Sequence, residues 1–440
     1  MSVTATRKGG PPAAAEKPAK QRYLAVDGLR GVCALALLFT HVAMIAGVLG
    51  TKELGGTIAS TSAVGGFFTG GLQIFAGVFF VLTGMFVYQG FAKSVINGTP
   101  RKREGTVIRR VLRLLPAYYV MYFVVLIALN LQQIDSVWDV FRPLALLHIY
   151  DWDGWSNGME ITWTVPDMAQ FYLLLPLLAW ATFKFASRGE TARARAYRMM
   201  LPVPLLFAAG IAWLLYSQMN GLGTRALFWY PMGLMPEVAI GMVIAIWLEL
   251  QKASPNEAPK LLTFAGRHRV LFLGIALTCL LINCARPGSE IGMDDYYSLT
   301  ALGIFYGLLA ILSASLLLSM VAPGPESRVI RAVFTNRVIL FVGKISYGVY
   351  LWQFAVMHFY LQKPNAYFNG EPMPLMLIRA GTGFWELQLV TLVGTIILST
   401  ISYYVLERPL MNWGERVIKR RAARKAAAEL PRPREESVPV

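Results

Sequence analysis

The chain of 440 residues is too apolar for a water-soluble protein. Hydrophobic residues make up 55% of it and charged residues 15%, whereas soluble domains carry about 25% charged residues. The formal charge is +16, from 41 Lys and Arg against 25 Asp and Glu. Such an excess can indicate nucleic-acid binding, but cytoplasmic loops of membrane proteins also concentrate Lys and Arg. The composition therefore predicts a membrane protein whose basic side chains face anionic lipids, and it argues against nucleic acid as a partner.

About ten stretches are long and apolar enough to form transmembrane helices, each of which needs about 20 residues. The polar, Pro/Ala-rich residues 1–22 are predicted to be disordered and contain no cleavable signal. The stretch at 270–285 is the shortest, and the outer end of 163–185 is poorly defined because polar residues precede it. The sequence thus predicts an all-α polytopic membrane protein. Its expected spans cover residues 26–49, 72–92, 112–131, 163–185, 199–217, 231–250, 270–285, 298–321, 339–361 and 384–406.

Basic residues alternate strongly between successive connections. The odd connections hold only six of the 41 Lys and Arg residues, and the other 35 lie in the even connections, the termini and the adjoining helix ends. Because cytoplasmic loops are enriched in Lys and Arg, both termini are predicted to be cytoplasmic, in a bacterial inner or plasma membrane. The expected organisation is a transmembrane domain at 23–410 and a basic cytoplasmic tail at 411–440. The six outer residues are Lys52, Arg142, Arg225, Arg286, Lys363 and Arg379.

The predicted outer connection at 132–162 combines carboxylates with tryptophans. Tryptophans at this depth are typical interfacial anchors, but carboxylates and aromatic rings together also suit the binding of a sugar. The sequence leaves both interpretations open. The residues concerned are Asp135, Asp139, Asp151, Asp153, Glu160, Trp138, Trp152 and Trp155.

Three ionisable residues lie in the first predicted span, where such groups are costly and are functional candidates. Arg30 and His41 are eleven residues apart, so they share one helix face about 16 Å apart along the axis. Asp27 is one turn before Arg30 and can pair with it. The alternative is that His41 is a hydrogen-bonded residue between helices and that Arg30 only follows the positive-inside rule.

Seven sequence blocks resemble, in order, the motifs of the membrane acyltransferase-3 family. In that family an Arg and a His separated by ten residues open the first helix. Later blocks are similar to its FFVLSGF, RR-x-x-R-x-x-P-x-Y, WSLSVEEQFYLLLP, PEFLLGMLLA, G-x-ISYSLYLWH and E-[KR]-P patterns. The matching stretches are LAVDGLRGVCALALLFTHV (24–42), FFVLTGMFVY (79–88), RRVLRLLPAYY (109–119), residues 163–176, MPEVAIGMVIA (235–245), FVGKISYGVYLW (341–352) and ERP (407–409).

The resemblance implies an enzyme that takes an acyl group, commonly acetyl, from cytoplasmic acyl-CoA. It passes the group to a hydroxyl of an extracytoplasmic carbohydrate or glycolipid of the cell envelope. Arginine suits the CoA phosphates because it forms charge-assisted bidentate bonds. Candidate CoA-binding residues are therefore Arg30 and the trio Arg109, Arg110 and Arg113, although the trio also fits routine positive-inside charge. Acyl-CoA is expected as a substrate, and no permanently bound cofactor or metal is expected.

His41 is the leading catalytic candidate because histidine accepts and returns protons near neutral pH. It can act as general base on the acceptor hydroxyl or carry the acyl group itself, and the sequence does not separate these roles. Where the family has Glu-Glu, this chain has Met168-Ala169 with Asp167 one residue earlier. Asp167 and Glu237 are therefore secondary catalytic candidates. The family's His after YLW is replaced by Gln353, which is expected to support the site without titrating.

Two other functional classes compete with this interpretation. A transporter or flippase could use the same buried charges as a substrate path, whereas a membrane scaffold would not need them. The acceptor, the acyl group and the oligomeric state stay open. Because no SGNH-type hydrolase segment is recognised after the last predicted span, acceptor recognition is expected from the helices and the 132–162 connection. His148, His268 and His358 lack ligand spacing and receive no predicted role.

Overall fold

The structure is a computed structural model in which nearly every described residue is helical. It describes residues 23–46, 67–68, 70–99, 105–150, 157–285, 298–361, 367–368, 371–372 and 383–428. Within these ranges, nine helices are long and apolar enough to cross a membrane, and the number is ten if one bent pair counts as a span. The predicted all-α architecture of about ten spans is therefore confirmed. The predicted disordered segment 1–22 lies outside the described residues.

The long helices follow the predicted spans closely. α4 continues through a π-helical turn, η3 (Leu126–Asn130), and a 3-10 turn, η4 (Leu131–Gln133), and α3 and α10 are preceded by the short turns η2 (Leu72–Ile74) and η6 (Pro231–Leu234). The helices are α1 (Leu24–Ile45), α3 (Phe75–Ile96), α4 (Thr106–Val125), α6 (Thr164–Ser187), α8 (Pro202–Met219), α10 (Met235–Ala253), α12 (Arg269–Cys284), α13 (Leu299–Val321), α15 (Arg337–Leu361) and α16 (Phe384–Ile401).

Shorter elements connect the spans. Most are helices of one or two turns. Two strands of two residues each form an antiparallel pair, in which Tyr367 pairs with Pro372 and Phe368 with Glu371. They are α5 (Val137–Leu144), η5 (His148–Tyr150), α7 (Ala192–Met199), α9 (Gly223–Phe228), η7 (Pro255–Glu257), α11 (Lys260–Arg267), α14 (Arg328–Phe334), β1 (Tyr367–Phe368) and β2 (Glu371–Pro372).

The shortest predicted span, 270–285, forms a sharp bend with the short helix that precedes it. α12 has 16 residues, so it is about 24 Å long and shorter than the bilayer core of about 30 Å. It meets α11 at 92° around His268. Arg269 stabilises the corner by donating to backbone carbonyls at the end of α13, including Ser319 O at 2.7 Å and Pro325 O at 2.8 Å.

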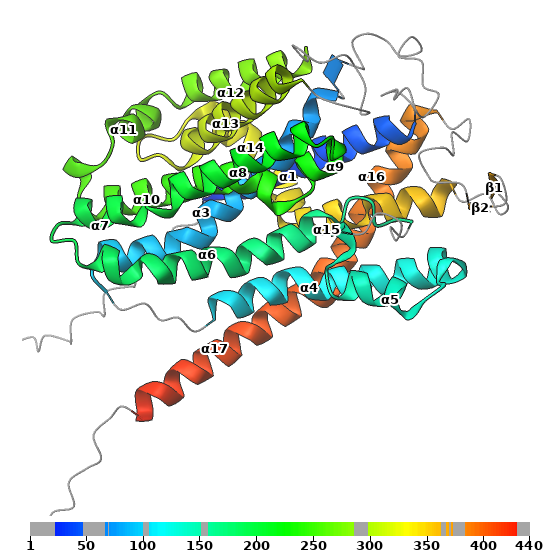
Figure 1. The fold of residues 1–440 in the computed structure, drawn as a ribbon, viewed down its shortest axis with the longest axis horizontal. Helices are drawn as coiled ribbons and strands as arrows, with labels where there is room; N and C mark the ends of the chain where they lie inside the picture. Colours follow the sequence, from blue (N-terminus) through cyan, green and yellow to red (C-terminus); the bar gives the residue numbers. More distant parts are fainter. Residues whose placement is uncertain are drawn as a thin grey trace, which may run out of the picture.

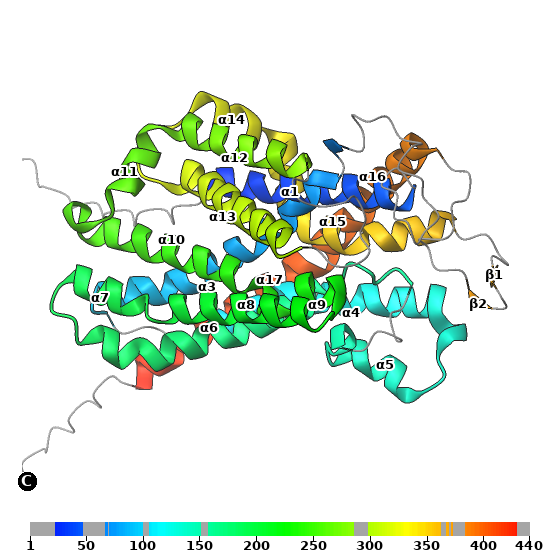
Figure 2. The ribbon, with the colours of Figure 1, turned by 45° about the horizontal axis from the view of Figure 1, so that its top comes forward.

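The bundle has two outer groups of helices and a central group. Figure 2 shows α12, α13 and α14 on one side and α6, α7 and α8 on the other, with α1 and α15 between them. In Figure 1 the long helices run in a broadly common direction across the molecule. The closest helix pairs are α3 with α10, α1 with α15, and α15 with α16.

Apolar side chains face outward, as expected for helices in lipid. On α6, Leu173, Leu177 and Trp180 are each 60% exposed at helical spacing. On α16 one face is polar and buried, and it carries Thr391, Thr395 and Ser399. Polar hydroxyls inside and apolar side chains outside are the arrangement of a membrane bundle, in which small and hydroxyl-bearing residues line helix interfaces. This pattern supports a multi-pass membrane protein independently of hydropathy.

Glycines bring α1 and α15 into backbone contact. A β-carbon at Gly343 would lie 2.0 Å from the carbonyl oxygen of Asp27, and one at Gly31 would lie 2.8 Å from the backbone nitrogen of Gly343. Ten residues further along each helix, the side chains of His41 and Gln353 meet. The two helices therefore run parallel with matched register, and the glycine contact fixes the pairing about 15 Å away.

We expect Gly343→Ala to destabilise the bundle because its β-carbon forces α1 and α15 apart. Inserting a methyl group into a tight backbone contact typically costs about 1–3 kcal/mol, which thermal melting of the purified protein in detergent would detect. Gly307→Ala on α13 is the matched control, since its β-carbon meets no heavy atom within 4 Å. Equal melting temperatures for the two variants would show that the glycine contact does not determine helix spacing.

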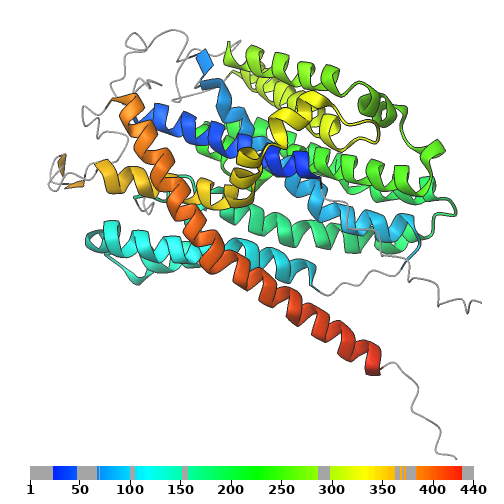
Figure 3. The same cartoon turned by 180° about the vertical axis from the view of Figure 1, so that it is seen from behind.

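The last predicted span runs directly into the tail as one long helix. α16 continues through the π-helical segment η9 (Ser402–Glu407) into α17 (Arg408–Ala428), and Figure 3 shows this helix projecting beyond the bundle. The exposed guanidinium of Arg109 on α4 forms an ion pair with Glu415 at 2.5 Å, and Leu112 packs at Gly414. The first part of the predicted tail, up to Ala428, is thus helical, and residues 429–440 lie outside the described part.

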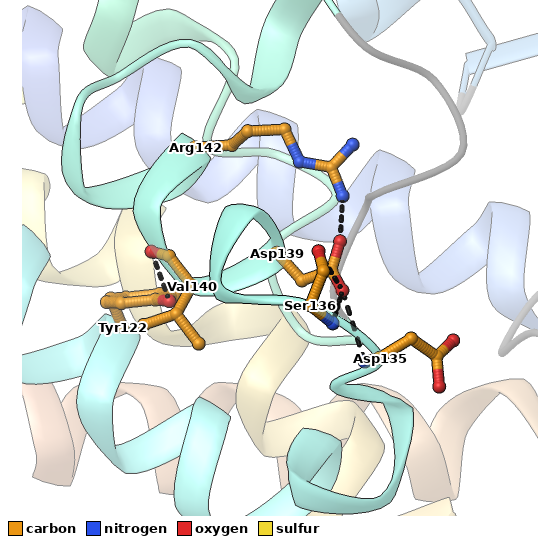
Figure 4. A network of polar contacts seen from close by, with 6 residues as sticks. All are labelled: Tyr122, Asp135, Ser136, Asp139, Val140 and Arg142. Carbon is orange, nitrogen blue, oxygen red and sulfur yellow. Dashed lines mark hydrogen bonds and ion pairs between the residues drawn. The ribbon is translucent and has the colours of Figure 1, made fainter.

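The connection at 132–162 is folded onto the end of α4. The hydroxyl groups of Tyr118, Tyr119 and Tyr122 donate to carbonyls of residues 143, 144 and 140 in α5. Ser136 and Asp139 form a capping box at the start of α5, and Asp139 also pairs with Arg142 (Figure 4). The pKa of the Asp139 carboxyl lies below its usual value, chiefly because the carboxylate accepts a hydrogen bond from the Ser136 backbone amide. These groups build the connection itself, and Trp152 and Trp155 lie outside the described residues.

Candidate active site

His41 lies on α1 and is held by a side chain of α15. Its Nδ1 is 3.0 Å from Oε1 of Gln353, and its ring is 5.1 Å from the ring of Phe354. Gln353 is fully buried, whereas His41 is only partly buried. A buried amide thus orients an imidazole that keeps some access to its surroundings.

The second hydrogen bond of Gln353 determines which nitrogen of His41 is protonated. Its Nε2 donates to the carbonyl oxygen of Tyr350 at 3.0 Å, so Oε1 is the amide atom that faces the imidazole. An oxygen can only accept, and His41 must therefore donate from Nδ1–H. Nε2 keeps its lone pair and can accept a proton or attack a carbonyl carbon. Gln353 consequently takes the supporting part expected from the sequence, although it orients His41 and not a substrate hydroxyl.

Arg30 lies about three turns before His41 on α1 and faces a different set of helices. It is within electrostatic range of Asp27, of Arg113 on α4, of Tyr172 on α6 and of Glu407 in η9. Two cations and two carboxylates from α1, α4 and η9 thus meet at one end of α1, beside Tyr172 of α6. Their formal charges cancel, and Arg110, which is within electrostatic range of Arg113, adds the positive charge that can bind an anion.

The three arginines of α4 do not act as one group. Arg110 places its guanidinium 4.9 Å from the centre of the Tyr172 ring, a cation–π geometry, and Arg113 interacts with Arg30. Arg109 instead pairs with Glu415 of α17 at the surface. The structure therefore brings Arg30, Arg110 and Arg113 together around Tyr172 and leaves Arg109 outside that group.

Glu407 belongs to this cluster and was not among the residues selected from the sequence. Its side chain is 3% exposed, and its Oε1 accepts a hydrogen bond from Ser402 at 3.2 Å. Both Arg30 and Arg113 are within electrostatic range of it. The π-helical turn changes the residue spacing of the helix and directs Glu407 inward. The only sequence signal for it was the Glu-Arg-Pro match after the last span.

Asp167 and Glu237 are both buried, in different places. Asp167 is in the first turn of α6 and is 0% exposed, and Glu237 is in the first turn of α10 and is 1% exposed. In the part of the chain that the structure describes, both oxygens of Asp167 lack a hydrogen-bond partner, and so does Oε2 of Glu237. Among the described residues, no hydrogen bond or ion pair joins either carboxylate to His41. The structure therefore provides no direct contact for a carboxylate–histidine pair here.

The histidines without a predicted role have structural partners. His148 stacks on Tyr118 and its Nε2 is 3.0 Å from Thr162 Oγ1. His358 lies near the end of α15, 2.5 Å from Glu160 of the outer connection. This second contact links residues 157–162 to the helix that also holds Gln353, whichever side of the membrane they face, and sequence spacing gave no sign of it.

Comparison with known proteins identifies the family. A family model described as an acyltransferase domain matches residues 23–404, most of the chain. The chain belongs to the acyltransferase-3 family. The match covers the described residues from Tyr23 at the start of α1 to Tyr404 in η9, including His41, Arg30, Arg113 and Gln353.

Several curated relatives of this chain have low but extended similarity. A Staphylococcus aureus protein assigned as an O-acetyltransferase is 25% identical over 425 residues, covering 92% of this chain and 60% of the relative. A Bacillus subtilis protein assigned as a peptidoglycan O-acetyltransferase is 25% identical over 432 residues, covering 92% and 57%. Nodulation protein 10 of Rhizobium leguminosarum is 24% identical, covering 69% and 67%. The chain thus spans about three fifths of the first two relatives. No solved structure matches it significantly.

Where the family has a Glu-Glu pair, this chain has Met168 and Ala169, and the structure shows their surroundings. Met168 and Ala169 pack against a hydrophobic cluster that includes Tyr118 and Leu351. A shift of one residue rotates a side chain by about 100° around a helix, so Asp167 faces a different neighbourhood, near Tyr150 and Tyr350. Asp167 therefore does not occupy the place of Met168 or Ala169.

Proposed function

We propose that this acyltransferase moves an acyl group, most simply acetyl, from cytoplasmic acyl-CoA to a hydroxyl of an extracytoplasmic carbohydrate or glycolipid. The observation on which the proposal chiefly depends is the His41–Gln353 pair, which presents a basic Nε2 on the helix that also bears Arg30. The family supplies the reaction class, and the names of the relatives point to O-acetyl transfer.

The two ends of α1 suit the two substrates. Arg30, Arg110 and Arg113 can bind the CoA phosphates by charge-assisted hydrogen bonds. The pantetheine arm would then extend along α1 over the roughly 16 Å that separates Arg30 from His41 and bring the thioester carbonyl to the imidazole.

His41 can perform the transfer in either of two ways. As general base, Nε2 takes the proton of the acceptor hydroxyl while its oxygen attacks the thioester carbonyl; the C–S bond breaks, and the proton passes to the departing CoA thiolate. As acyl carrier, Nε2 attacks the thioester carbonyl first, and the C–S bond breaks with departure of the CoA thiolate. The acceptor hydroxyl then attacks the acyl-imidazole, the C–N bond breaks, and the hydroxyl proton balances the one that the thiolate takes up. Both routes give an ester and CoA thiol, and both require the Nδ1–H tautomer that Gln353 enforces.

Acyl transfer by the purified protein distinguishes this function from transport. The assay mixes the protein in detergent with acetyl-CoA and an envelope glycan fraction, then follows CoA thiol release and the acetyl mass increment on the glycan. We expect both products to appear together. A transporter or flippase without chemistry would yield neither product, yet would still move labelled glycolipid across a vesicle membrane.

The proposed membrane orientation follows from the distribution of basic residues. In intact cells, an impermeant thiol reagent is expected to label Trp138→Cys, whose side chain is 48% exposed in α5, and to leave Arg103→Cys unlabelled until the cells are opened. Background labelling is expected to be low because Cys33, Cys279 and Cys284 are buried. Labelling of position 103 in intact cells would reverse the orientation.

A further inference from the structure

Asp167 is a buried carboxylate whose oxygens accept no hydrogen bond from the residues that the structure describes. Its side chain is 0% exposed. Burying an ionisable group in a membrane bundle without a partner is costly, so such residues mark substrate sites by default. The free acceptor capacity of Asp167 corresponds to two hydrogen-bond donors from a ligand.

The hydroxyl groups nearest to Asp167 are committed elsewhere. Tyr150 and Tyr350 both lie within electrostatic range of its carboxylate. The Tyr350 hydroxyl donates to the carbonyl of Ile161, and the Tyr150 hydroxyl donates to Oε1 of Gln170 at 2.9 Å. Tyr150 is also 42% exposed, so it is the neighbour of Asp167 that a ligand arriving from outside can reach first.

Aromatic rings from several segments gather beside the first turn of α6. Trp163, four residues before Asp167, stacks between Phe80 and Trp229 with ring centres 6.1 Å apart on each side. The ring of Tyr150 lies 5.3 Å from that of Tyr230. Trp163, Trp229 and Tyr230 are only partly buried. Rigid aromatic faces of this kind contact apolar ligand surfaces while polar groups beside them bind hydroxyls.

This region is linked to the reactive histidine through α15. The side chain of Tyr350 is within electrostatic range of Asp167, and its backbone carbonyl accepts from the amide of Gln353, which holds His41. One electrostatic interaction and two hydrogen bonds thus relate Asp167 to the imidazole. A ligand bound at Asp167 would extend from there toward His41.

We propose that Asp167 and Tyr150, beside Tyr230, form an acceptor subsite for a pyranose sugar, in which the carboxylate accepts from two neighbouring hydroxyls of the ring. This inference rests on the proposed function and assigns Asp167 to acceptor binding and not to proton transfer. Two adjacent hydroxyls satisfy both carboxylate oxygens together, and the apolar face of the same ring can lie against the aromatic side chains. A simple alcohol would satisfy only one oxygen.

The test compares wild type with Asp167→Asn in the full-length purified protein. The substrates are acetyl-CoA and methyl hexopyranosides, intact or lacking one hydroxyl. We expect Asp167→Asn to raise KM for the pyranoside by about ten- to a hundredfold, as for loss of a charge-assisted hydrogen bond, and to leave KM for acetyl-CoA within about twofold. Wild type should prefer the intact sugar to at least one deoxy sugar by at least about tenfold, and the variant should lose this preference.

Thermal melting separates a binding role from a structural one. Because Asp167 has no internal partner, Asp167→Asn should melt at the same temperature as wild type or higher, whereas loss of a structural carboxylate would lower it. Unchanged KM for the pyranoside, an effect confined to acetyl-CoA, or a preference for amines over diols would each overturn the subsite. CoA release without sugar acylation by wild type would defeat the subsite and leave the acyl-CoA reaction standing. Absence of any CoA release would defeat the proposed function, and the subsite with it.

Discussion

His41→Gln is expected to lower acyl transfer by about a hundred- to ten-thousandfold, the usual contribution of a general base. Glutamine can replace a hydrogen bond between helices but cannot take a proton or carry the acyl group. If His41 only joined α1 to α15, the substitution would cost about 0.6 kcal/mol, a typical value for such bonds in membranes, and activity would survive. The measurement is turnover of the purified variant with acetyl-CoA and an envelope acceptor, after melting has shown native-like folding.

Gln353→Leu is the companion variant for this prediction. It keeps the imidazole but removes the oxygen that accepts from Nδ1, so ring orientation and tautomer are no longer fixed. Loss of an orienting partner commonly costs about ten- to a hundredfold in activity, less than loss of the ring. A well-folded His41→Gln protein that keeps more than about a tenth of wild-type turnover would remove His41 from the chemistry and make Asp167 or Glu237 the leading base.

The second large effect is expected in donor binding. Replacing Arg30 or Arg113 with Ala should raise KM for acetyl-CoA by roughly ten- to a hundredfold, because a charge-assisted hydrogen bond contributes about 1.5–3 kcal/mol. The double variant should fall short of the product of the two effects, since the side chains interact with each other and with Glu407 and neighbouring sites are not additive.

Charge-matched controls distinguish phosphate binding from general electrostatic attraction. Arg420 is exposed on α17, so Arg420→Ala changes net charge by the same amount and should leave KM for acetyl-CoA unchanged. Arg109→Ala should have only a small effect because Arg109 pairs with Glu415 at the surface. If all four single variants shift KM equally, the arginines act only through the overall basic charge and no specific phosphate site exists at Arg30.

The spans could be predicted from sequence because bilayer thickness imposes a length and a hydropathy on each one. Helices α1, α13 and α15 begin and end within a few residues of their predicted bounds. The connecting helices α5, α7, α9, α11 and α14 could not be predicted in this way. They have six to eight residues, too few for hydropathy to separate from a polar loop, and packing against longer helices stabilises them.

The candidate site was only partly predictable, for a similar reason. Helical spacing placed Arg30 and His41 on one helix, but it could not show that Gln353 meets His41, because that contact depends on the glycine crossing between α1 and α15. Spacing also could not separate Arg109 from Arg113, which lie one turn apart on α4. Their environments differ because α17 lies beside α4 and supplies Glu415 to Arg109 alone.

Transfer across a sealed membrane tests the central claim most directly. Purified protein is reconstituted into vesicles, labelled acetyl-CoA is added outside only, and an envelope glycan acceptor is enclosed inside. The account predicts that label accumulates on the enclosed glycan, that free CoA thiol appears outside in equal amount, and that His41→Gln abolishes both. Label that reaches the glycan at the same rate with His41→Gln, or only after the vesicles are opened, would contradict it.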